Sequence, residues 1–236
     1  CVLASLIAHG VAVALGGETT RFALHAVPDR LDAPLIARLV LFGVVCAVLS
    51  AVVCILFHQI GRFLKRKIPN QYICIAAGGA AVAAVSLLLG TRDYNGAGMA
   101  VIERAIAGEA HYTAFFIKLV LTAITIGVGY KGGEIVPVLF IGATFGAAYG
   151  GFFGLAPSFA AGLGMTAVFC GVTNSPLTSI LLAYELFGGV GLELIALGCG
   201  VCYMLSGTHG LYSSQLFVTE KLLSEYTESW GKRLRK

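Results

Sequence analysis

The chain reads Gly132-Gly133-Glu134-Ile135-Val136-Pro137 and continues with the apolar run Val138-Leu139-Phe140-Ile141-Gly142-Ala143-Thr144-Phe145-Gly146. The two glycines allow the backbone to approach a ligand closely, Pro137 suits the first turn of a helix, and the apolar run continues that helix. The amides of Glu134, Ile135 and Val136 then lack acceptors within the helix. Because free amides add to the positive end of the helix dipole, the stretch predicts a helix N-terminus that can bind an anion.

The composition indicates a membrane protein. Hydrophobic residues make up 58% of the 236 residues and charged residues only 12%, against about 25% charged in typical soluble domains. The mean hydropathy is +0.88. The net charge is +4, but the basic residues lie at the ends of apolar segments and form no stripe for nucleic acid. We therefore expect a protein embedded in a lipid bilayer, with no nucleic-acid partner.

In a bilayer, the glycine-rich break before residue 138 needs a purpose. Irregular backbone at membrane depth is tolerated only where protein buries it or where it lines a cavity. Transporters place such broken helices at their binding sites, with helix N-termini directed at anionic groups. The break therefore indicates a transport pathway or a binding site.

Apolar segments separated by breaker residues predict an all-α polytopic membrane protein with tilted and broken helices. The second segment would be roughly 48 Å long, more than a perpendicular crossing needs, so we expect it to tilt. The first begins without a charged leader, and we interpret it as a truncated span of a longer protein. The expected helices cover residues 2–15, 33–64, 71–90, 99–107, 112–128, 136–153, 158–170, 176–187, 191–205 and 213–228.

Two basic clusters set the expected topology. One, Arg62 with residues 65–67, closes the second segment, and the other lies at residues 232–236. Both belong in the cytoplasm by the positive-inside rule, which puts the polar loop 16–32 outside. Residues 213–236 are then a final amphipathic helix with a basic cytoplasmic tail.

A second break, at residues 206–215, carries Tyr212. If Tyr212 points inward, its hydroxyl can donate to the anion that the amides of Glu134 to Val136 hold. A phenol is neutral at pH 7, so it can donate without trapping the ion by full charge.

Three motifs in order resemble the second half of the CLC family of chloride channels and proton-coupled anion antiporters. Gly133-Glu134-Ile135-Val136-Pro137 resembles the G-x-F-x-P anion motif of that family. The segment 171–185 is similar to its apolar helix that ends in an acidic residue, here Glu185. The loop with Tyr212 matches its pore tyrosine. The resemblance covers nearly the whole chain and implies that residues 1–236 are the C-terminal half of a CLC-type transmembrane domain.

The resemblance implies transport of chloride or a similar small anion, by a channel or a proton-coupled antiporter. The amides of Glu134 and Ile135 would coordinate the central anion, and the Tyr212 hydroxyl would contact it. The gating glutamate and the serine-bearing anion loop of the family belong to the other half. The resemblance also implies a homodimer, with residues 159–196 as a candidate surface, in a prokaryotic plasma membrane, and no cofactor.

Two positions depart from the family motif. Ile135 replaces the usual phenylalanine, and Glu134 stands where an apolar residue is common. A fluoride-exporting branch resembles this sequence in having a glutamate there, followed by Val-Thr-Pro, which keeps a fluoride/proton antiporter as the alternative. An ionised acid beside an anion site repels the anion, so we expect Glu134 either to take part in proton coupling or to cap local amides or face a water-filled vestibule.

Other residue types point to less. The five histidines share no ligand spacing, so we expect no metal site, and the seven cysteines suggest no disulfide. The aspartates all lie in predicted loops, so an intramembrane enzyme is only a remote alternative to anion transport. A structural membrane subunit is a second remote alternative. Lys118 is expected to snorkel or to make a helix contact, with a part in ion conduction as the alternative. Gly142 and Gly146 have the small-xxx-small spacing of close helix packing.

Overall fold

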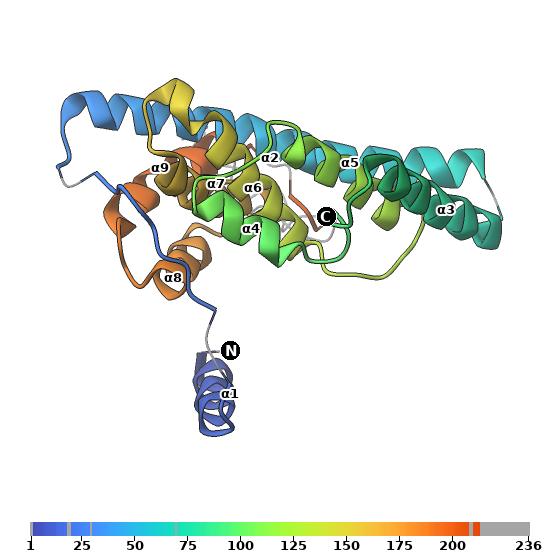
Figure 1. The fold of residues 1–236 in the computed structure, drawn as a ribbon, viewed down its shortest axis with the longest axis horizontal. Helices are drawn as coiled ribbons and strands as arrows, with labels where there is room; N and C mark the ends of the chain where they lie inside the picture. Colours follow the sequence, from blue (N-terminus) through green and yellow to red (C-terminus); the bar gives the residue numbers. More distant parts are fainter. Residues whose placement is uncertain (1, 18–19, 29, 69, 208–209, 213–236) are drawn as a thin grey trace, which may run out of the picture.

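The computed structural model describes residues 2–17, 20–28, 30–68, 70–207 and 210–212, and every regular element in those ranges is helical. The predicted helix at 213–228 and the basic tail lie outside the described residues. Figure 1 shows the arrangement, in which α2 runs along the length of the molecule and α1 lies apart from the other helices. The helices are α1 Val2–Ala14, α2 Ala33–Lys67, α3 Gln71–Leu89, α4 Met99–Ile106, α5 Ala114–Gly127, α6 Ile135–Tyr149, the 3₁₀ turn η1 Gly150–Phe153, α7 Pro157–Thr173, α8 Pro176–Phe187 and α9 Leu192–Leu205.

The order of helices agrees with the sequence prediction, and the local reasons are visible at their ends. The Asp32 side chain accepts a hydrogen bond from the Leu35 amide at 2.9 Å and starts α2. The Asn70 side chain does the same for α3, which ends at Gly90 with φ 63°. One expected helix, 136–153, instead ends at Tyr149 and continues as the 3₁₀ turn η1. These capping residues explain why the boundaries were readable from the sequence.

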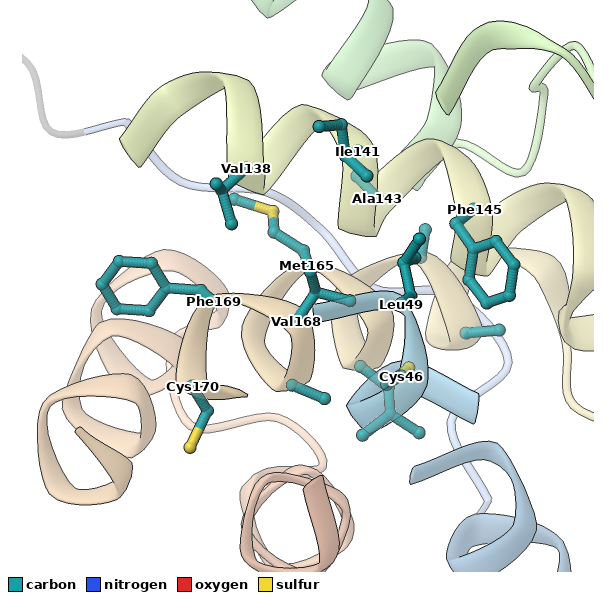
Figure 2. Close-up of a cluster of buried hydrophobic side chains, with 14 of the residues drawn as sticks. Cys46, Leu49, Val138, Ile141, Ala143, Phe145, Met165, Val168, Phe169 and Cys170 are labelled. Carbon is teal, nitrogen blue, oxygen red and sulfur yellow. The ribbon is translucent and has the colours of Figure 1, made fainter. Parts of the chain in front are cut away.

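The closest helix contact is between α6 and α7, the most extensively packed pair in the structure. A Cβ atom added to Gly142 would lie 2.5 Å from the carbonyl oxygen of Gly164, and one added to Gly146 would overlap the carbonyl oxygen of Ala160. The predicted small-residue packing is confirmed. Figure 2 shows part of the surrounding core, to which α6 contributes Ile141 and Phe145, α7 contributes Met165, and α2 contributes Cys46 and Leu49.

Helix α7 is the centre of the core. Residues 158–172 are all buried by the chain itself. We expected residues 159–196 to be a candidate dimer surface, and for the α7 part of that range the expectation is wrong, because α2, α6 and α9 already cover it. On α8, in contrast, Leu177, Leu181 and Tyr184 remain exposed.

Three helices are long and apolar enough to cross a membrane: Ala33–Leu64, Gln71–Leu89 and Ile135–Phe153. Four shorter apolar helices, α5, α7, α8 and α9, accompany them. The 35 residues of α2 reach roughly 52 Å, so a tilt in a bilayer is expected, as predicted from the sequence. The unequal lengths fit a membrane protein of tilted and broken helices.

The α6–α7 contact predicts a severe effect for the smallest substitution. Gly142→Ala places a methyl group against the Gly164 carbonyl and the Met165 backbone, which cannot move without separating the helices. We expect a loss of about 2 kcal/mol of stability or more, measured as a lower thermal midpoint of the purified protein in detergent. Gly200→Ala in α9 is the matched control, because an added Cβ there meets nothing within 4 Å. Equal midpoints for the two variants would contradict the role given to this contact.

Candidate functional site

The N-terminus of α6 has the form that the sequence predicts. Helix α6 begins at Ile135, directly after Glu134, and its first backbone hydrogen bond joins the Val138 amide to the Glu134 carbonyl at 3.3 Å. Within the described part of the chain, the amides of Glu134, Ile135 and Val136 have no hydrogen-bond acceptor. No side chain caps this end. The three predicted donors are therefore free, at the positive end of a 15-residue helix.

The loop before α6 leaves space for a ligand. Gly132 and Gly133 are exposed, and a Cβ atom on either would meet nothing within 4 Å. Ile135 is 40% exposed, whereas Val138, one turn further, is fully buried. The amides thus lie at the boundary between an open region and the packed core, where a bound anion would be partly removed from water.

Helix α2 forms one wall beside Glu134. The Glu134 carboxyl group is half-buried and lies within electrostatic range of His58 and Cys54. Nδ1 of His58 is 2.8 Å from the Cys54 carbonyl oxygen. A carbonyl can only accept, so Nδ1 of His58 carries a proton. A carboxyl group and an imidazole therefore lie within electrostatic range of each other beside α2.

The loop with Tyr212 reaches the same stretch of α2. The Leu211 amide donates to the Val172 carbonyl at 2.9 Å, which fixes this loop to the end of α7. The Cys54 thiol also approaches that carbonyl, at 4.0 Å. A cavity of about 400 Å³ joins the two segments and is lined by Cys54, Ile55, His58, Gln59, Arg62 and Gly210.

The structure thus brings the two predicted breaks to one region, although they are far apart in sequence. Glu134 lies within electrostatic range of Cys54 and His58 of α2, and Gly210 of the Tyr212 loop lines a cavity with the same two residues. The Tyr212 side chain is 49% exposed, and in the described residues its hydroxyl makes no hydrogen bond to α6. The amides and the hydroxyl therefore share a region without touching one another.

Sequence reasoning missed His58 and Arg62. They lie one turn apart on α2, a spacing that places both on one face, but no local signal says that this face borders a cavity shared with Gly210 of the Tyr212 loop. The open cavity beside them comes from the fold alone.

The remaining acid and base that the sequence singled out occupy simpler positions. Glu185 is exposed near the end of α8, as expected for a residue that ends its helix. Lys118 is 2% exposed and donates to the carbonyls of Tyr94 and Gly96. It makes a contact between α5 and a loop and does not snorkel.

Comparisons with known proteins agree with the motifs. The family model described as "Voltage gated chloride channel" matches residues 1–207. A "Chloride/fluoride channel protein" of Pseudomonas syringae pv. tomato is 32% identical over 222 residues, covering 91% of this chain and 49% of that protein. An "H(+)/Cl(-) exchange transporter ClcA" of Vibrio vulnificus is 29% identical over 150 residues, covering 57% of this chain and 32% of that protein.

A solved structure shares the fold. The crystal structure of a CLC-type fluoride/proton antiporter superposes with a TM-score of 0.81 at 28% sequence identity, covering 86% of this chain and 51% of that one. The chain therefore spans about half the length of the relatives that it matches over most of its own length. The resemblance inferred from the three motifs is confirmed, and this all-α membrane chain belongs to the CLC family of voltage gated chloride channels.

Proposed function

We propose that this chain forms the C-terminal half of a transmembrane pathway for chloride or a similar small anion. The observation that carries the proposal is the N-terminus of α6, where three adjacent amides lack acceptors within the described residues and border open space. Amides are neutral donors that bind an anion without a fixed counter-charge, so the anion can also leave. A pathway needs that balance between binding and release.

Each residue of the predicted site has a role in this proposal. The amides of Glu134, Ile135 and Val136 coordinate the anion, Gly133 keeps the approach open, and Pro137 lies in the first turn of the helix without adding a donor. Tyr212 contributes a neutral hydroxyl from the second break. The shared stretch of α2 at residues 54–58 supports this assignment, because it places both breaks in one region.

Proton coupling is the finer part of the proposal. Glu134 is the acid nearest to the free amides, and His58 lies within its electrostatic range. A protonated Glu134 leaves the amides available to an anion, whereas an ionised one competes for them and repels it. This antagonism would couple proton and anion movement and would make the protein an antiporter rather than a channel.

Fluoride is the second candidate substrate. The names of two of the similar proteins include fluoride, and the alignment with one of these proteins covers 91% of this chain. The glutamate at position 134 is the feature of this sequence that resembles the fluoride-exporting branch. A small, strongly hydrogen-bonding anion also suits a site built from amides and a phenol, which supply donors but no permanent charge.

The same proposal places the protein in a prokaryotic plasma membrane as a homodimer. Bacterial relatives support the location. For the dimer, the exposed apolar face of α8, with Leu177, Leu181 and Tyr184, replaces the α7 surface that the structure excludes.

The first test is anion efflux from liposomes that contain the complete protein, recorded with chloride and fluoride electrodes while external pH is measured. We expect anion efflux with opposed proton movement. A preference for fluoride would select the second candidate, and efflux without protons would select a channel. An intact, folded protein that moves neither anion would overturn the proposal.

Glu134→Gln tests the coupling role. The substitution keeps the size of the side chain and removes its titration, so proton movement should fall at least about tenfold more than anion movement, comparable to losing one positioned proton carrier. The same liposome assay reports both fluxes. Glu185→Gln, an exposed acid on α8, is the control and should leave both unchanged. An unaltered proton-to-anion ratio in Glu134→Gln would remove this residue from the mechanism.

Tyr212→Phe tests the second break. Loss of one hydroxyl donor to a charged ligand should raise the half-saturating anion concentration by about tenfold, with little change in stability because the side chain is 49% exposed. Tyr184→Phe, an exposed tyrosine on α8, is the matched control. Identical saturation curves for the two variants would exclude the Tyr212 hydroxyl from the site.

A further inference from the structure

A second cavity lies on the α5 side of the same helix N-terminus. It has a volume of about 450 Å³ and is enclosed by α3, the loop at residues 94–97, α5 and the start of α6. Lys118 and Thr122 of α5 line it, as do Gly133 and Val136. It shares no lining residue with the cavity beside His58. The two cavities are therefore separate, and of the two only this one is lined by residues of α6.

Lys118 brings a buried positive charge to this cavity. Its ammonium group donates to the carbonyls of Tyr94 at 3.0 Å and Gly96 at 2.6 Å and lies 5.0 Å from the centre of the Phe140 ring. An ammonium has three donors, so one remains after the two carbonyls. Carbonyls and a ring face stabilise the cation but do not neutralise it.

No carboxylate of the described residues pairs with this charge. Asp93 is the acid nearest to the 94–97 loop in sequence, and it already forms an ion pair with Arg104. A charge that is 98% removed from solvent usually has a counter-charge, because desolvating it alone is costly. Among the described residues, therefore, no acid supplies a counter-charge to Lys118.

Thr122 adds an unsatisfied donor one turn further along α5. It is 8% exposed, and within the described residues its hydroxyl has no hydrogen-bond partner. The other buried threonines differ, since the hydroxyls of Thr144 and Thr166 bond to carbonyls of their own helices. A buried hydroxyl without a partner points to an absent acceptor. Residues four apart lie on one helix face, so Lys118 and Thr122 present their donors to the same space.

We propose that this cavity is a second anion-binding site, in which the Lys118 ammonium and the Thr122 hydroxyl hold a monovalent halide. One buried positive charge is neutralised by one negative charge, and a dianion would exceed it. The positive end of α6 and the exposed Lys131 at the cavity rim add to the attraction. The inference rests on the proposed function for the choice of a halide, and it extends the pathway from the amides toward the 94–97 loop.

The test locates bromide by anomalous diffraction in crystals of the complete protein. A cavity of about 450 Å³ sets no size limit between fluoride and bromide, so bromide is a valid probe. We expect a peak in contact with Lys118 Nζ and Thr122 Oγ1. Thr122→Val, which removes the hydroxyl at nearly constant volume, should reduce halide affinity at this position by about tenfold. The peak should fall accordingly at subsaturating bromide.

Thr144→Val is the matched control, because Thr144 is also buried but bonds within its own helix and does not line the cavity. It should keep the peak. Lys118→Met should abolish the peak, but it also breaks the bonds to the 94–97 loop, so Thr122→Val is the deciding variant. An empty cavity in the unsubstituted protein, or equal peaks in the two threonine variants, would overturn the inference.

Flux separates this inference from the proposed function. Anion efflux from liposomes together with an empty cavity would leave the function standing and remove the second site. A bromide peak in a protein that moves no anion would leave the second site standing and remove the proposed function.

Discussion

Close backbone contact between α6 and α7 holds the rest of the structure in place. Gly142 and Gly164 let the two helices approach until carbonyl oxygens of one touch the backbone of the other. In a bilayer, apolar side chains gain little by leaving lipid, so such packing supplies much of the association between helices. Because residues 158–172 of α7 are all buried, α7 is the fixed element against which α6 packs.

That contact also decides what the N-terminus of α6 can do. The helix is anchored from Val138 onward, where the side chain is fully buried, while Glu134 to Val136 remain free of backbone acceptors among the described residues. Donors that are held rigidly need little reorganisation when an anion arrives. The rigid core therefore holds the N-terminal amides of α6 in a position where they have no backbone acceptor.

At this helix end, the charged side chains lie beside the proposed anion site, and the groups that face the anion are neutral. Neutral donors face the proposed anion, while Glu134 and His58 lie to one side and Lys118 to the other. The buried Lys118 ammonium lowers the cost of removing an anion from water, and its hydrogen bonds to the carbonyls of Tyr94 and Gly96 limit how firmly it can hold that anion.

Much of the fold was predictable because its signals are local. Asp32 and Asn70 cap helices through their own side chains, and Gly90 ends one through its positive φ. The α6 N-terminus was predictable for the same reason, since glycines, a proline and an apolar run suffice to define it. The dimer surface on α7 was not, because burial of a small-residue apolar helix depends on which neighbours reach it, and lipid-facing and core-facing apolar residues look alike in sequence.

The sequence by itself determined that this is a membrane protein of the CLC family, with two breaks and a helix end whose amides lack acceptors in the helix, because composition, capping and motif order are properties of neighbouring residues. Only the tertiary structure decided that residues 54–58 of α2 bring Glu134 near the Tyr212 loop. It also decided that Lys118 lies buried beside Thr122, whose hydroxyl has no hydrogen-bond partner among the described residues. These facts depend on contacts between residues distant in the chain, and helix periodicity says which residues share a face but not what that face meets.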